Sequence, residues 1–61
     1  MTREQYETIN EWLRDGGINL PETRSTLDRV SRVADGLKAT LEQRRLLLAR
    51  ALYDLMKAKA Q

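Results

Sequence analysis

The apolar positions of this chain recur every three or four residues, which is the spacing of one face of an α-helix. Over residues 3–15, Tyr6, Ile9 and Leu13 lie on one face, and charged side chains take the opposite side. No stretch alternates apolar and polar residues as a half-buried strand does. The pattern therefore predicts an all-α fold that opens with an amphipathic helix over residues 3–15.

Local signals mark both ends of this first helix. Thr2 and Gln5 fit a capping box, in which each side chain satisfies a backbone N–H group at the start of a helix. Residues 16–20 are predicted to form a loop, because Gly16 or Gly17 can adopt the left-handed conformation that closes a helix. Pro21 suits the first turn of the next helix, so that helix should begin at about residue 22.

A seven-residue pattern, with spacings that alternate between three and four, runs through the rest of the chain. Its members are Leu27, Val30, Ala34, Leu37, Leu41, Arg44, Leu48, Ala51, Leu55 and Ala58. Gly36 is the candidate break, but a glycine inside a helix costs only about 1 kcal/mol relative to alanine. Because the apolar stripe keeps its phase through Gly36, the pattern favours one long helix over about residues 22–59, with a possible bend at Gly36. Two separate helices are the alternative.

The lengths of the two predicted helices indicate a helical hairpin in which the short helix covers only part of the long one. At about 1.5 Å per residue, the long helix spans nearly 60 Å and the first helix only about 20 Å. The short N-terminal helix can then cover Leu27 to Leu37 of the long C-terminal helix and leaves its far half without a partner. A chain of 61 residues with no cysteine and no histidine has neither a disulfide nor a thiolate or imidazole metal site to stabilise it.

We therefore expect the hairpin to assemble as a homodimer, in a dimeric helical bundle. The residues predicted to meet their counterparts in the second chain are Leu41, Leu48, Leu52 and Leu55. The alternative is a monomeric bundle of three helices, broken at Gly36, that buries the same stripe within one chain.

A second surface of the long helix is predicted to bind another protein. Leu46, Arg50, Tyr53 and Met56 face away from the predicted dimer contact, and an exposed Leu–Arg–Tyr ridge has the composition of binding hot spots. Trp12, on the edge of the first helix's apolar face, is the next candidate for a partner contact, although core packing or closure of the hairpin explains it as well.

Charge and chemistry narrow the function classes. The chain has 11 Lys and Arg against 9 Asp and Glu, with no histidine to serve as a catalytic base beside its two serines, and no glycine motif for phosphate. An enzyme, a cofactor and a metal are therefore not expected. The acidic N-terminus is unlike a signal peptide, and the longest apolar run, Leu46 to Ala49, is far too short for a membrane span, so we expect a cytoplasmic protein.

The resulting hypothesis is a small protein–protein interaction module, an adaptor or inhibitor that docks on a larger protein such as a transcriptional regulator or an ATPase. The alternative is a small dimeric DNA-binding regulator whose arginines contact phosphates. Those arginines would be Arg24, Arg29, Arg32, Arg44 and Arg45. Nucleic acid is the weaker hypothesis, because Asp28 and Asp35 interrupt the basic face that phosphate binding requires.

Overall fold

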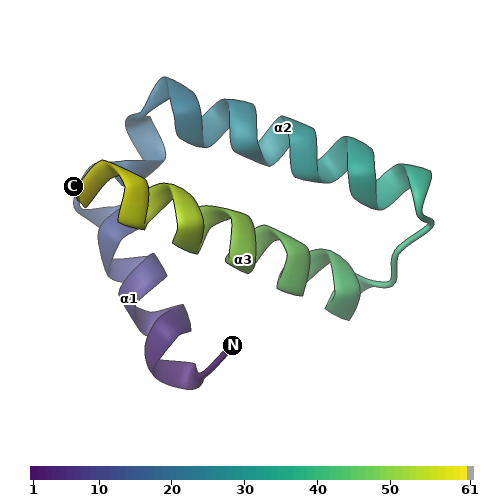
Figure 1. Cartoon of the computed structure of the whole chain (residues 1–61), viewed down its shortest axis with the longest axis horizontal. Helices are drawn as coiled ribbons and strands as arrows, with labels where there is room; N and C mark the ends of the chain where they lie inside the picture. Colours follow the sequence, from purple (N-terminus) through teal and green to yellow (C-terminus); the bar gives the residue numbers. More distant parts are fainter. Residues whose placement is uncertain (61) are drawn as a thin grey trace.

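The computed structural model describes residues 1–60, and within them the chain is helical with no strand, which confirms the predicted all-α class. Three α-helices and one short 3₁₀ helix follow each other along the chain (Figure 1). They are α1 (Arg3–Arg14), η1 (Gly17–Asn19), α2 (Pro21–Gly36) and α3 (Leu41–Ala60).

The ends of α1 form as predicted. The Thr2 hydroxyl accepts the backbone N–H of Gln5 at 3.2 Å, and the Gln5 side chain accepts the backbone N–H of Thr2 at 2.8 Å, which completes the capping box. At the other end, Gly16 has a φ of 118°, a conformation that side chains larger than glycine rarely adopt. Pro21 occupies the first turn of α2, where its missing N–H costs no hydrogen bond.

A tight corner joins α1 to α2. The indole of Trp12 lies directly against the backbone of Gly17, so closely that a Cβ atom at Gly17 would be 2.7 Å from Cδ2 of the ring. The fully buried Thr23 donates its hydroxyl hydrogen to the Gly17 carbonyl at 2.5 Å. Trp12 therefore closes the corner between the two helices, one of the two roles that its position in the sequence allowed.

The long helix predicted over residues 22–59 is wrong, because α2 ends at Gly36 and α3 begins at Leu41. The chain turns back between them, and the two helices lie antiparallel and side by side (Figure 1). The in-phase apolar stripe that favoured continuity suits this arrangement equally well, since each helix still buries one face. Turning back lets the two halves of the stripe cover one another, whereas a straight helix would leave them in water. The three-helix alternative is the arrangement observed in the chain.

Backbone hydrogen bonds of a Schellman motif end α2. The N–H of Ala39 donates to the carbonyl of Ala34 at 2.9 Å, and the N–H of Lys38 donates to the carbonyl of Asp35 at 3.1 Å. Lys38 has a φ of 53°, so a lysine occupies the left-handed position where glycine is usual. Gly36 itself stays helical.

A second capping box begins α3 and repeats the one at α1. The Thr40 hydroxyl accepts the N–H of Gln43 at 3.2 Å, and the Gln43 side chain accepts the N–H of Thr40 at 2.9 Å. Arg44, the residue that interrupted the apolar seven-residue pattern, reaches across the turn and donates to the Asp35 carboxylate at 2.6 Å. A charged residue at this point of the apolar pattern is thus explained by its ion pair, which links α3 to α2.

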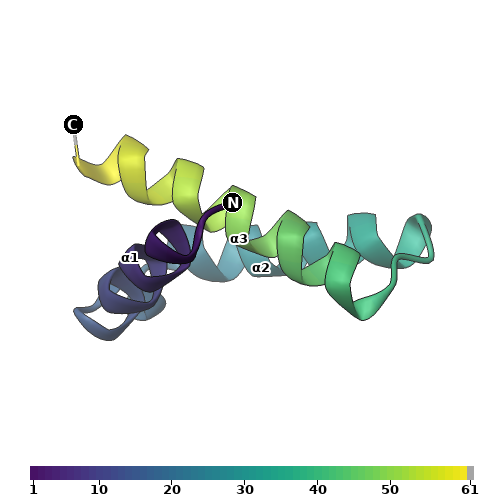
Figure 2. The same ribbon diagram turned by 90° about the horizontal axis from the view of Figure 1, so that it is seen from below.

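One buried cluster joins α1 to α3, and Val30 and Ala34 of α2 are buried as well. The expectation that α1 covers Leu27 to Leu37 is therefore corrected, because the buried residue of α1 packs against α3. Ile9 of α1 packs against Ala49 and Leu52 of α3, and each of these three side chains is less than a tenth exposed. In Figure 1, α1 lies on the opposite side of α3 from α2, and Figure 2 shows α1 crossing below α3. Because α3 folds back, its middle part meets α1, and both sides of this helix are used within one chain.

Candidate functional site

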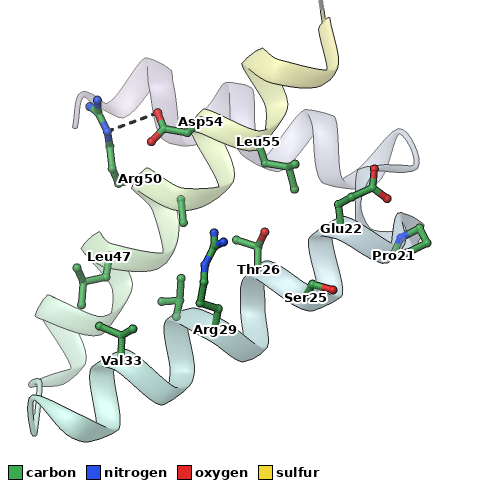
Figure 3. Close-up of a pocket in the computed structure, with 12 residues that line it drawn as sticks. Pro21, Glu22, Ser25, Thr26, Arg29, Val33, Leu47, Arg50, Asp54 and Leu55 are labelled. Carbon is green, nitrogen blue, oxygen red and sulfur yellow. Dashed lines mark ion pairs between the residues drawn. The ribbon is translucent and has the colours of Figure 1, made fainter.

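The face of the α2–α3 pair away from α1 carries an open groove of about 780 Å³. In Figure 3, Thr26, Arg29 and Leu55 point toward the space between the two helices, whereas Arg50 and Asp54 extend from α3 on the side away from α2. The lining residues, which define what we call the α2–α3 groove, are Pro21, Glu22, Ser25, Thr26, Arg29, Val30, Val33, Leu47, Arg50, Ala51, Asp54 and Leu55.

The floor of the groove is apolar because two helical stripes face each other across it. Val30 and Val33 come from α2, and Leu47, Ala51 and Leu55 come from α3 at spacings of one turn. Val30 is buried, but Val33 and Leu47 are 49% and 37% exposed. The small side chain of Ala51 leaves the middle of the groove hollow. The exposed aliphatic surface is thus concentrated toward the end of the groove nearest the α2–α3 turn.

Charged side chains form the rim of the groove, and most of them are paired. Arg50 and Asp54 are one helical turn apart on α3 and form an ion pair, with 3.6 Å between Nε of Arg50 and Oδ1 of Asp54. At the far end, Lys59 of α3 pairs with Glu22 of α2. The hydrogen bond from Lys59, aided by a backbone hydrogen bond, holds the pKa of the Glu22 carboxyl below its ordinary value. Among residues 1–60, Arg29 forms no ion pair.

The four leucines predicted for the dimer contact do not form one exposed surface. Leu52 is 4% exposed and belongs to the core of its own chain, so the prediction that it meets a second chain is corrected here. Leu48 is half-buried and packs against the same core. Leu55 is half-buried at the groove floor, whereas Leu41, at the start of α3, is 85% exposed. No residue among the described 1–60 covers Leu41.

The predicted partner-binding ridge on α3 is divided between two sides of the helix. Leu46 is 49% exposed, and Arg50 is exposed at the rim of the groove. Tyr53 is half-buried against the core, with the Lys57 ammonium 5.0 Å from its ring centre. Met56 is half-buried as well. The ridge is divided because α1 covers part of the surface that was expected to face outward.

Two of the five arginines considered for phosphate binding make contacts within the chain. Arg44 pairs with Asp35, and the Arg45 guanidinium lies over the ring of Tyr6, 5.3 Å from its centre. The remaining three, Arg24, Arg29 and Arg32, are exposed on α2. These contacts account for Arg44 and Arg45 without a ligand.

Within residues 1–60, no three acidic residues gather as a metal site would require, and no helix is both long and apolar enough to cross a membrane. No buried side-chain nitrogen or oxygen in this part of the chain lacks a hydrogen-bond partner. The α2–α3 groove is therefore taken as the candidate functional site.

Sequence reasoning identified Leu55 and Arg50 of this groove and considered Arg29 only as a phosphate contact, but it missed Val33 and Leu47. The seven-residue stripe does not include Arg29, Val33 or Leu47, and only the antiparallel packing of α2 on α3 brings them to one surface.

Comparisons of the chain with protein-family models, with curated proteins and with solved structures find no match.

Proposed function

We propose that the chain is a non-enzymatic protein–protein interaction module, an adaptor or inhibitor that docks on a larger protein through the α2–α3 groove. The observation that carries this proposal is the aliphatic groove floor, where Val33 and Leu47 are 49% and 37% exposed on facing helices. Contiguous exposed apolar surface with a charged rim is characteristic of protein-binding sites.

The total surface of the chain supports the proposal. Its accessible area is 4847 Å². A compact monomer of 7.1 kDa is expected to expose about 4,100 Å², so the chain exposes roughly 750 Å² more. A standard protein–protein interface buries about 800 Å² on each partner. The chain therefore has about as much excess surface as one interface would cover.

The shape of the groove indicates what kind of segment fits it. From Glu22 to Val33 the groove follows α2 for about three turns, or roughly 17 Å. Two parallel ridges with an apolar floor accept an amphipathic helix that presents side chains at i, i+3 or i+4, and i+7. A small polar ligand would need buried groups that converge on it, and the described groove has an aliphatic floor instead.

Self-association stays a prediction, and of the residues first predicted for it Leu41 is the exposed one, now joined by Leu37. Leu37 and Leu41, on either side of the α2–α3 turn, are 68% and 85% exposed and are available to a second chain. Leu52 is not available, because Ile9 covers it. Homodimerisation through the turn would leave the groove free for a larger protein.

Leu46 and Leu47 provide a matched pair of variants for testing the proposal. They are neighbours on α3, but Leu47 lines the groove and Leu46 does not. The immobilised chain is incubated with an extract of the cells that produce it, and bound proteins are quantified by mass spectrometry. We expect Leu47→Lys to reduce the recovery of a stoichiometric partner about tenfold, as loss of a hot-spot contact does, and Leu46→Lys to leave it unchanged.

Two results would contradict the proposal. Equal recovery by all three forms would show that the groove binds no protein. Selective loss with Leu46→Lys would instead move the contact to the exposed side of α3 that carries Leu46. Circular dichroism of each variant provides the folding control, since both substitutions are at exposed positions of the same helix.

A further inference from the structure

We infer that the groove binds an amphipathic helix that carries a carboxylate on the flank facing α2, and that Arg29 pairs with this carboxylate. The inference rests on the proposed function and specifies the chemistry of the partner. Its basis is the charge at the groove rim, where a single guanidinium is left without a counter-charge.

The charges of the rim differ between its two sides. The α3 side has Arg50 and Asp54, which neutralise one another, and Glu22 at the end of the groove is neutralised by Lys59. Arg29, on the α2 side, forms no ion pair with any residue among the described 1–60. The α2 side of the groove is therefore positive and the α3 side is neutral.

The position of Arg29 suits a contact with a bound segment. It lies on α2 between the turns of Thr26 and Val33, at the middle of the groove. In Figure 3 its side chain extends from α2 toward the space between the two helices. A guanidinium presents a planar fork of N–H donors that matches the two oxygens of a carboxylate, which gives the contact direction as well as charge.

The partner helix can be specified further from the length of the floor. A groove of about 17 Å takes roughly 12 helical residues, so three aliphatic side chains at i, i+4 and i+7 would lie along it. The carboxylate must lie beside the middle one of these, on the α2 flank, because Arg29 is at the middle of the groove. Acidic residues on the other flank would face the mutually neutralised Arg50 and Asp54 and would find no unpaired positive charge there.

A second copy of this chain does not supply such a helix. Its acidic helix is α1, where Glu4, Glu7 and Glu11 are exposed. The apolar face of α1 is already buried, since Ile9 packs against α3 and Leu13 against the same core. The occupant is therefore expected to be a segment of a different protein.

The test uses a displayed library of helical peptides of about 14 residues, with aliphatic residues fixed at i, i+4 and i+7 and the flanking positions varied among Glu, Lys, Gln and Ala. Peptides are selected against the full chain, against Arg29→Glu and against Arg24→Glu. Arg24→Glu is the matched control, because Arg24 is also an exposed arginine of α2 but lies outside the groove.

We expect the unmodified chain and Arg24→Glu to enrich Glu on one flank beside the middle aliphatic residue, and Arg29→Glu to enrich Lys there. The best Glu peptide should bind Arg29→Glu about five- to tenfold more weakly, the effect of reversing one charge of an exposed pair. Enrichment of aliphatic peptides with no charge preference at that position would overturn the inference while leaving the proposed function intact.

Failure of the proposed function has a different signature. If Leu47→Lys selects the same peptides as the unmodified chain, or if no form selects any peptide, the groove is not a helix-binding site. If the unmodified chain selects none and has twice the mass of the 7.1 kDa chain by light scattering, while Leu47→Lys is monomeric, the occupant is a second copy and the inference is wrong.

Discussion

Replacing Lys38 with glycine tests the turn between α2 and α3, on which the groove depends. Lys38 has a φ of 53° at the left-handed position of the Schellman motif that ends α2. It is exposed and forms no ion pair among the described residues 1–60. A substitution there acts mainly through the backbone.

The expected change in the free energy of unfolding is a small increase. Holding a residue with a Cβ atom in the left-handed conformation costs about 1–2 kcal/mol, and glycine avoids this cost. Glycine also gives the unfolded chain more freedom, which takes back about 0.4–1 kcal/mol. Lys38→Gly should therefore stabilise the chain by about 0.5–1 kcal/mol. For a domain of this size, that corresponds to an increase in Tm of about 2–8 °C.

Thermal unfolding followed by circular dichroism measures this change, with Lys38→Ala as the control. Alanine removes the charge but keeps the Cβ atom in the left-handed conformation, so its Tm should stay close to that of the unmodified chain. If residues 22–59 formed one continuous helix, the signs would reverse. Glycine would then cost about 1 kcal/mol relative to alanine, and a lower Tm for Lys38→Gly than for Lys38→Ala would refute the turn.

Two further predictions concern the corner between α1 and α2 and the link between the ends of α2 and α3. Gly17→Ala places a methyl group 2.7 Å from the Trp12 ring, so overpacking should destabilise the chain by about 1–3 kcal/mol and shift the tryptophan fluorescence. Gly36→Ala is the control, since nothing lies within 4 Å of its Cβ position and the helix should gain stability, by up to about 1 kcal/mol. Glu22 has a pKa below its ordinary value of 4.5 because it accepts a hydrogen bond from Lys59, so the folded state binds this proton less readily than the unfolded state. The Tm advantage of the unmodified chain over Lys59→Met should be constant above pH 4.5 and disappear as the pH falls through the lowered pKa; an advantage that persists in acid would contradict the pairing.

The groove illustrates why a site of this kind is only partly visible in a sequence. Arg50 and Leu55 were noticed because they lie on or beside the apolar stripe of α3. Val33 and Leu47 have no such signal, since each lies off the stripe of its own helix. The two residues come to one surface only because the helices pack antiparallel. In the sequence, Arg29 does not differ from the other exposed arginines of α2. Only the structure shows that, among residues 1–60, the other charged side chains of the groove rim are paired and Arg29 is not.

The sequence by itself determined the class of fold and where the first two helices begin. These signals can be read locally, because they depend on hydrogen bonds and dihedral angles within a few residues. They are the capping box of Thr2 and Gln5, the left-handed glycine after α1 and the placement of Pro21. The same local signal was present at the turn, where Thr40 and Gln43 repeat the first capping box, and it marks the start of α3 better than Gly36 marks the end of α2.

Only the tertiary structure decided which faces of the helices meet. The helix α3 is apolar around most of its circumference, so its sequence does not single out the side that packs on α1, the side that packs on α2 and the side left open. That choice depends on contacts such as Ile9 with Leu52, which join residues far apart in the chain. Burial free energy depends on apolar area and has little directional preference, so a helix with several apolar faces has several comparable partners until the whole chain is folded.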